Sequence, residues 1–297
     1  MRASAIRELV VSRDATKVAA AFFEKTVQIW DLATRERIIE FETVFSFGGR
    51  RLVLDAAGQK CVSAGWGQGK RGGVACYEAD TGKLIWHRQD LRQTQRVRFS
   101  SLRGGFWCFP YSGRTRLLNP VNGSEVDSIP GFHDFYESEY SGQLLLERRN
   151  RDYILKNGEP RKIPRITPAI LDAAFGTQSF VMSEMGGPVR CIDSSAGIEL
   201  WRFMPEKGSH FVRLWFRGTD GNFCGVLHHY EQNRYRRLVR LDAATGEART
   251  LCGLDSWYEA YCVKLHCVVT SSGDLIDLPE GRLFHRLKFP QRDYSQQ

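Results

Sequence analysis

The sequence has no run of roughly 18 or more uncharged apolar residues, the length that a membrane-spanning helix needs. Its first 17 residues carry Arg2, Arg7, Glu8 and Arg13 and lack the apolar central block of a secretory signal. Long amphipathic helical patterns are missing as well, although 42% of the 297 residues are hydrophobic, which is enough to form a large core. These absences lead us to expect a cytoplasmic protein that is built from β-strands.

The eight cysteines lack the spacing of a metal site or a redox pair. No Cys-x-x-Cys pair occurs, and no cysteine lies with histidine at the spacing of zinc ligands. We therefore expect no cofactor and no metal. Cysteines inside apolar runs are interpreted as buried free thiols that pack as small hydrophobic residues; they are Cys61, Cys76, Cys108, Cys191, Cys224 and Cys267.

Signatures of common enzymes are also missing. The nucleophile elbow Gly-x-Ser-x-Gly does not occur. The phosphate-loop pattern fails near its best match, because Lys70 is followed by Arg71 instead of serine or threonine. His228 and His229 are direct neighbours, and adjacent residues on a strand point to opposite faces, so they are poorly placed to bind one metal. We predict a protein without catalytic activity.

What the sequence does contain is a motif that returns seven times. Each copy has an apolar residue, an acidic or amide residue, a few small or polar residues and a turn. The turn positions span 246 residues in six steps, or 41 residues per step, close to the about 40 to 45 residues of a propeller blade. These positions are Arg35, Gly82, Gly123, Gly158, Gly197, Gly246 and Gly281.

Each motif predicts a hairpin, because glycine supplies the positive φ that a tight turn requires and Asp or Asn bonds to nearby amides. β-rich runs flank the turns, as at residues 74–77 and 84–86, and two more runs lie upstream in each unit. Four-stranded sheets of this kind bury their faces by stacking around a ring. We predict an all-β fold, a single seven-bladed β-propeller of four-stranded antiparallel blades over residues 1–297. The expected blades are approximately 7–47, 48–92, 93–133, 134–167, 168–208, 209–252 and 253–292.

The units resemble two propeller families. Residues 27–31, which end in Trp30-Asp31, resemble WD repeats, although the Gly-His dipeptide of those repeats is missing. Residues 80–86 and 195–201 resemble pyrroloquinoline-quinone-type (PQQ-like) repeats, in which a tryptophan docks on the next blade. We expect Trp30, Trp86 and Trp201 to pack between blades. We also expect the first blade to pack against the last without exchange of a strand.

The four strands of a blade divide the loops between two faces, and one face is rich in Arg, Tyr and Trp. These residue types are enriched at binding hot spots, because they give a large contact area with few degrees of freedom. We predict that this face binds a partner protein through Trp66, Lys70, Arg71, Tyr111, Arg114, His133, Tyr136, Arg148, Arg149, Arg151, His229, Tyr230, Arg234, Arg236, Trp257 and Tyr258.

The formal net charge of +8 favours a partner with an acidic surface. Glu147, Asp152, Glu231 and Asp255 interleave with the arginines and weaken the field that a nucleic acid would need. We therefore predict a protein-interaction module, either an inhibitor or immunity-type protein or a subunit of a complex. A nucleic-acid-associated propeller and a propeller enzyme with a site at the central channel are the alternatives.

Overall fold

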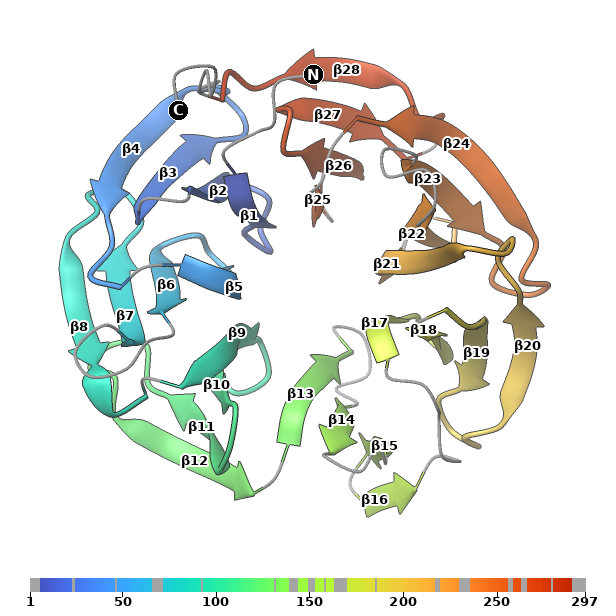
Figure 1. The fold of residues 1–297 in the computed structure, drawn as a ribbon, viewed down its shortest axis with the longest axis horizontal. Coiled ribbons are helices and arrows are strands. Elements are labelled where there is room, and N and C mark those ends of the chain that lie inside the picture. The colour runs from blue at the N-terminus through green and yellow to red at the C-terminus, as the bar shows by residue number, and fades with distance from the viewer. Residues whose placement is uncertain are drawn as a thin grey trace. The chain divides into compact units, whose positions relative to one another are not determined.

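The computed structural model describes residues 6–22, 25–45, 47–65, 72–91, 93–130, 132–138, 144–148, 153–157, 159–162, 170–184, 186–216, 220–229, 236–255, 259–262, 266–278 and 280–289. Within these ranges the strands form seven four-stranded antiparallel sheets, each made of four consecutive strands (Figure 1). The chain divides into two compact units, which are described separately.

Unit 1 comprises residues 1–131, 256–277 and 283–297. Its described residues form four sheets and the short 3-10 helix η2 (Gln89–Leu91), which follows β8. The strands are β1 (Ile6–Val11), β2 (Lys17–Phe22), β3 (Thr26–Asp31), β4 (Arg37–Glu42), β5 (Phe47–Leu54), β6 (Lys60–Gly65), β7 (Gly73–Glu78), β8 (Leu84–Arg88), β9 (Thr94–Ser100), β10 (Gly105–Pro110), β11 (Arg114–Leu118), β12 (Glu125–Pro130), β25 (Glu259–Cys262), β26 (Cys267–Thr270), β27 (Asp274–Asp277) and β28 (Leu283–Arg286).

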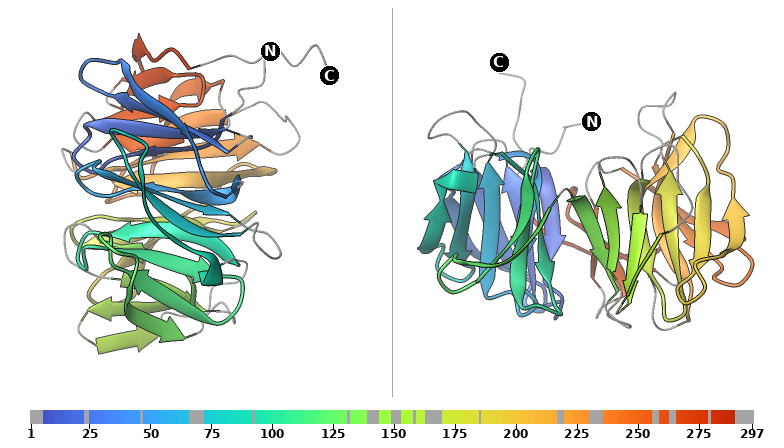
Figure 2. Two further views of the ribbon diagram at one scale, coloured as in Figure 1. Left: turned by 90° about the vertical axis from the view of Figure 1, so that its left-hand side faces the viewer. Right: turned by 90° about the horizontal axis from the view of Figure 1, so that it is seen from below.

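Unit 2 comprises residues 132–255 and 278–282, and its described residues form three sheets. The strands of each sheet run side by side, as the views of Figure 2 show. They are β13 (Phe132–Glu137), β14 (Leu144–Arg148), β15 (Tyr153–Asn157), β16 (Glu159–Lys162), β17 (Ile170–Phe175), β18 (Ser179–Glu184), β19 (Val189–Asp193), β20 (Glu199–Phe203), β21 (Ser209–Phe216), β22 (Phe223–His229), β23 (Arg236–Leu241) and β24 (Ala248–Leu254).

The prediction of seven blades is corrected: the structure gives six blades, which are the six sheets with described side chains on all four strands. The remaining sheet, β13–β16, is defined by backbone pairing, and only Tyr136, Glu137 and Leu145 of its strand side chains are described. It comes from the shortest of the predicted repeats, residues 134–167, and three of its strands, β14, β15 and β16, have only four or five residues. A short repeat supplies fewer apolar residues for a sheet interior. The prediction of one domain over the whole chain stays a prediction.

The predicted hairpin turns are confirmed where the structure describes them. The φ angle lies between +66° and +74° at Gly82, Gly123, Gly197, Gly246 and Gly281. Gly158 lies outside the described residues. Arg35 occupies the equivalent position with φ of +68°, a left-handed conformation that costs a non-glycine residue about 1–2 kcal/mol.

The turn of Arg35 keeps the geometry of the glycine turns. Its backbone N–H donates to the Asp31 carbonyl at 2.9 Å, as the N–H of Gly246 donates to the Asp242 carbonyl at 2.9 Å. Backbone amides also close both of these turns on the acidic side chain. The N–H of Thr34 donates to Asp31 Oδ1 at 2.7 Å, and that of Thr245 donates to Asp242 Oδ1 at 2.8 Å. These bonds explain why an acidic or amide residue precedes the turn in the repeated motif.

Aromatic rings on the outer strands dock on the glycine turns of the next sheet. Trp86 on β8 donates its indole N–H to the Pro120 carbonyl at 3.1 Å, and a Cβ on Gly123 would lie 2.7 Å from the ring. Trp201 on β20 repeats the contact in unit 2. Its indole N–H donates to the Ala243 carbonyl at 2.8 Å, and a Cβ on Gly246 would lie 2.6 Å from the ring. Glycine is therefore needed at these turns for space as well as for φ.

The first and last sheets of the chain share one hydrophobic core in unit 1. Ile6, Leu9 and Trp30 of the first sheet belong to the same buried cluster as Val269 and Leu275 of the last. The Trp30 ring also meets Phe289 edge to face, with ring centroids 4.5 Å apart. The predicted packing of the first blade against the last is confirmed. Both sheets consist of consecutive strands within the described residues, and the absence of an exchanged strand stays a prediction because residues 1–5 lie outside them. The predicted packing of Trp30, Trp86 and Trp201 between sheets is confirmed as well.

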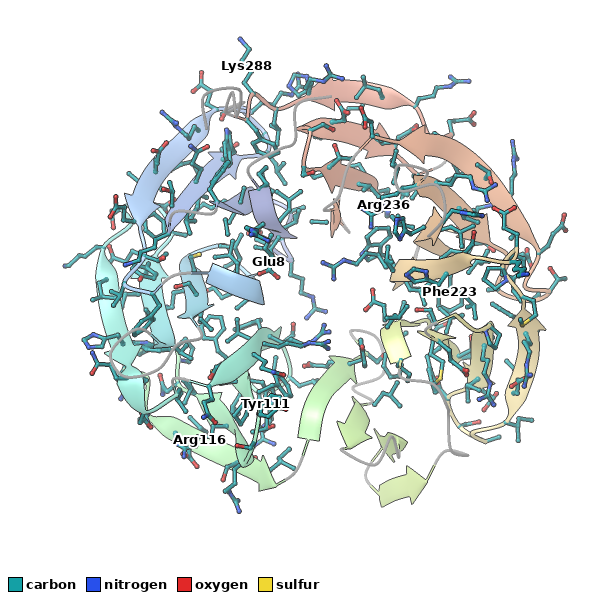
Figure 3. All side chains as sticks on the ribbon, viewed as in Figure 1. Glu8, Tyr111, Arg116, Phe223, Arg236 and Lys288 are labelled. Atoms are coloured by element: carbon teal, nitrogen blue, oxygen red, sulfur yellow. The ribbon has the colours of Figure 1, made fainter. Side chains whose placement is uncertain are left out.

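Buried carboxylates also link neighbouring sheets through their first strands. Glu8 on β1 accepts a hydrogen bond from the Leu52 N–H of β5 at 2.7 Å, and Figure 3 labels its side chain. Asp172 on β17 accepts one from the Leu214 N–H of β21 at 2.9 Å. Each carboxylate follows a β-bulge on its strand and is no more than 6% exposed. A bulge redirects a side chain, and here it turns an acidic residue toward the next sheet.

Candidate functional site

Most residues of the predicted binding face are not described by the structure. The side chains of His133 on β13 and Arg148 on β14 lie outside the described set. Nine more residues are outside the described ranges altogether: Trp66, Lys70, Arg71, Arg149, Arg151, Tyr230, Arg234, Trp257 and Tyr258. Their role in binding stays a prediction. The structure places Tyr111, Arg114, Tyr136, His229 and Arg236.

Two of these placed residues are buried. Tyr136 is 4% exposed and packs in the core shared by β13 and β17, and Arg236 is 7% exposed on β23. Tyr136 belongs to strand β13 and not to a loop. The apolar alternation of that strand is weak in sequence, since His133 and Asp134 interrupt it. Neither Tyr136 nor Arg236 presents open surface to a partner.

A row of basic residues crosses the sheet that contains Arg236. His210 on β21 is opposite His228 on β22, which is opposite Arg236 on β23. The two imidazole rings meet edge to face with centroids 5.5 Å apart. Burial, followed by the nearby His228 and Arg236, lowers the pKa of His210 to about 4. His210 is therefore neutral at pH 7 and acts as part of the sheet interior.

Tyr111 and Arg114 lie at a groove in unit 1. The β10–β11 turn forms one wall, and η2 with the segment before β9 forms the other. The groove has a volume of about 310 Å³, and its lining residues are Asp90, Leu91, Gln93, Pro110, Ser112, Gly113, Arg114 and Arg116. Tyr111 is 60% exposed beside it, and Figure 3 labels Tyr111 and Arg116 in this sheet.

The two walls of the groove are tied together by hydrogen bonds. The Tyr111 N–H donates to the Gln93 carbonyl at 2.9 Å, and the Ser112 hydroxyl donates to Gln93 Oε1 at 3.4 Å. The second wall is held in place by two contacts of Leu91. Its side chain is buried, with 7% exposed, and its carbonyl accepts a hydrogen bond from the Thr94 hydroxyl at 2.8 Å. The position of the β10–β11 turn is thus set by the crossing from β8 to β9.

A charged network includes two residues of the groove lining, Asp90 and Arg116. Arg88 holds the Asp90 carboxylate with two parallel hydrogen bonds of 2.7 Å, and Arg116 Nη1 donates to the same carboxylate at 3.1 Å. Arg116 Nε also lies 3.5 Å from Glu125 Oε2. The hydrogen bonds from Arg88 hold the pKa of Asp90 below its usual value. Two guanidinium groups stabilise the ionised form of this carboxyl, so Asp90 stays charged at neutral pH.

Arg114 differs from its neighbours in having no acidic partner among the described residues. Its Nε and Nη2 donate to the Ser128 hydroxyl at 3.0 and 2.8 Å, and Nη2 also donates to the Ser128 carbonyl at 3.2 Å. The side chain is exposed, and its guanidinium plane is fixed by Ser128. The result is an oriented positive charge at the edge of the groove.

Sequence reasoning identified Arg114 and Tyr111 but missed Arg88, Asp90 and Arg116. The signal for Arg116 was present, because Arg114-Thr115-Arg116 places two arginines on one face of a strand. Asp90 could not be assigned from its local sequence, since its role depends on arginines from β8 and β11.

The buried cysteines of the described residues are unsuited to nucleophilic chemistry. Six cysteines are buried free thiols, as predicted, and burial raises the pKa of Cys61 and Cys108 well above the usual range. These thiols stay protonated and are poor nucleophiles. Within the described ranges, no group of three or more His, Cys, Asp or Glu residues could hold a metal ion. The same ranges contain no helix with the length and apolar character needed to cross a membrane.

Comparison with known proteins defines the fold class. No protein-family model matches the chain, and no curated protein matches it. Among solved structures 1637 chains match, which is typical of a scaffold that carries many functions. One is "Structure of U3-55K", with a TM-score of 0.65 and 12% identity, covering 97% of this chain and 93% of that chain. At this identity the likeness shows the fold alone, a β-propeller, and membership of the PQQ-like family is not supported.

Proposed function

We propose that this protein is a non-catalytic protein-interaction module that binds a partner through the loop face containing the β10–β11 turn. The observation that carries the proposal is the groove beside Tyr111, in which Arg114 is exposed, oriented and without an acidic partner among the described residues. An exposed tyrosine beside an ordered arginine is the composition of a binding hot spot. WD40-type propellers present such loops on a rigid scaffold.

The charge state of the groove argues for binding over catalysis. A general acid or base needs a pKa near the working pH, whereas hydrogen bonds from Arg88 lower the pKa of Asp90. Asp90 therefore serves to orient Arg88 and Arg116. The partner is proposed to have an acidic surface, since the chain carries a net charge of +8 and Arg114 is available for an anion.

The proposal includes a cytoplasmic setting, which the seven free cysteines of the described residues support, because reduced thiols are typical of that compartment. The module would act either as an inhibitor or immunity-type protein or as a subunit of a larger complex. Both forms need the same docking surface. They differ in whether the partner is active when bound.

Replacing Tyr111 by alanine together with Arg114 by glutamine should weaken partner binding at least about tenfold, the scale expected for a hot-spot pair. The measurement is quantitative capture from native lysate by wild-type protein and by variants, followed by affinity measurement with the captured partner. Arg103→Gln is the matched control, because Arg103 is an exposed arginine in the turn between β9 and β10 and pairs with Asp127 at 2.7 Å. It should bind as the wild type does.

Equal capture by the double variant and the wild type would overturn the assignment of the face. A bound species that is nucleic acid, released from both proteins by moderate salt, would favour the alternative of a nucleic-acid-associated propeller. A protein complex is expected to lose affinity through faster dissociation of the variant and to persist at that salt concentration.

A further inference from the structure

The groove of unit 1 carries information about the chemistry of its occupant. Its charged lining residues are two arginines, Arg114 and Arg116, and one aspartate, Asp90. Arg88 and Glu125 lie outside the lining and pair with Asp90 and Arg116. The positive and negative charges nearly cancel, and the sum is one positive charge. Arg88 and Arg116 have carboxylate partners, so the excess belongs to Arg114.

The hydrogen bonds that Arg114 makes with Ser128 leave other N–H groups of its guanidinium available to a ligand. Ser128 uses Nε and Nη2, whereas no described residue accepts a hydrogen bond from Nη1. The orientation of the guanidinium is set before binding, which lowers the entropy cost of forming a new hydrogen bond. An oriented guanidinium with free N–H groups favours a planar oxoanion such as a carboxylate.

The size of the groove limits what can enter. Its volume of about 310 Å³ lies at the lower end of the about 300–1,000 Å³ of ligand pockets. This is space for one or two side chains, and Ser112 and Gln93 line it with further polar groups. Tyr111, 60% exposed at the rim, can cover the chain that carries those side chains.

The acidic members of the network select against ligands of higher charge. The Asp90 side chain is 50% exposed and that of Glu125 is 38% exposed, so both repel additional negative charge near Arg114. A phosphate monoester carries about −1.5 to −2 charges at pH 7 and would make the occupied groove negative. A single carboxylate makes it neutral. A nucleic acid would place successive phosphates near Asp90 and Glu125, and these carboxylates would repel them.

We propose that the groove receives one Asp or Glu side chain of the partner protein, with its carboxylate on the free N–H groups of Arg114. This inference rests on the proposed function and specifies its partner: an extended acidic segment that inserts a single carboxylate between η2 and the β10–β11 turn. Arg116 and Arg88 hold Asp90 of the groove lining in place, and Tyr111 contacts the neighbouring part of the segment.

The inference is tested with three capped tripeptides of the form Ala-X-Ala, in which X is glutamate, glutamine or phosphoserine. The readout is the Nε–Hε resonance of Arg114 in the full-length ¹⁵N-labelled protein. We expect the glutamate peptide to shift this resonance saturably and the glutamine peptide to leave it unchanged, while Arg103 stays constant with all three. Ser128→Ala should weaken the glutamate response about threefold or more, because it frees the guanidinium without changing charge.

A glutamine peptide that shifts the resonance equally, a phosphoserine peptide that binds more tightly than the glutamate peptide, or no shift with any peptide would each overturn the inference. These results are separable from the proposed function. If the peptides fail but the Tyr111/Arg114 variant loses its partner, the binding face stands and the carboxylate assignment fails. If the glutamate peptide binds but the partner stays on the double variant, the groove binds carboxylates but is not the docking face.

Discussion

Replacing Trp86 by alanine should lower the free energy of unfolding of unit 1 by about 3–5 kcal/mol, the range for truncating a buried aromatic residue. The ring is 8% exposed and belongs to a core that joins the sheets β5–β8 and β9–β12. Truncation removes this packing and the hydrogen bond from the indole to the Pro120 carbonyl. It also removes the indole ring that packs against the Gly123 turn. Urea unfolding followed by far-ultraviolet circular dichroism measures the change.

Trp86→Phe separates packing from hydrogen bonding. Phenylalanine keeps most of the ring but cannot donate to Pro120, so it should cost about 1–2 kcal/mol, the value of a lost hydrogen bond with a smaller ring. A loss below about 1 kcal/mol for Trp86→Ala would contradict the docking of this ring as a main contact between the two sheets.

Acidification should destabilise unit 2 through His210, by up to about 3 kcal/mol between pH 7 and pH 4. Burial lowers the pKa of His210 to about 4, whereas the unfolded chain is protonated near its ordinary value of about 6.5. Because the folded pKa is the lower one, the stability is fully present above pH 6.5. It is lost as the pH falls from 6.5 toward 4, since the unfolded state then binds the proton more readily.

The groups that face His210 act in the same direction. His228 on β22 and Arg236 on β23 place further positive charge beside a protonated ring, and burial lowers the pKa of His228 as well. His210→Phe should flatten the fall of the unfolding free energy across this window when urea unfolding is repeated at several pH values. His87→Gln, on the exposed part of β8, is the control and should keep the fall. An identical pH profile for His210→Phe and wild type would contradict the account.

The turns of the fold could be predicted from the sequence because their requirements are local. A positive φ needs glycine or a strained residue, and the closing hydrogen bonds need an Asp or Asn a few residues earlier. Both requirements select particular residue types at a fixed spacing in the sequence. Gly82, Gly197 and even Arg35 could therefore be located without structural information. The number of packed blades was less well determined, because the repeat that forms β13–β16 is short.

The site depends on contacts between different strands, which the local sequence does not reveal. Asp90 is important because Arg88 and Arg116 reach it from two strands, and Arg114 is distinctive because Ser128 on β12 orients it. Arg236 resembles a loop arginine in sequence, yet β23 begins there and buries it opposite His228. Such pairings require the register of neighbouring strands, which the alternation of apolar residues fixes only loosely.

The claim that the repeated motif exists to dock one sheet on the next is tested most directly by Gly246→Ala against Gly197→Ala. The two glycines have φ of +74° and +70°, but a Cβ on Gly246 would lie 2.6 Å from Trp201, whereas one on Gly197 meets no described atom within 4 Å. Gly197→Ala should cost about 1–2 kcal/mol from backbone conformation, and Gly246→Ala about 1–3 kcal/mol more from displacing the ring. Equal losses in the two variants would show that the turn glycines serve only their own hairpins and would contradict the docking of sheet on sheet.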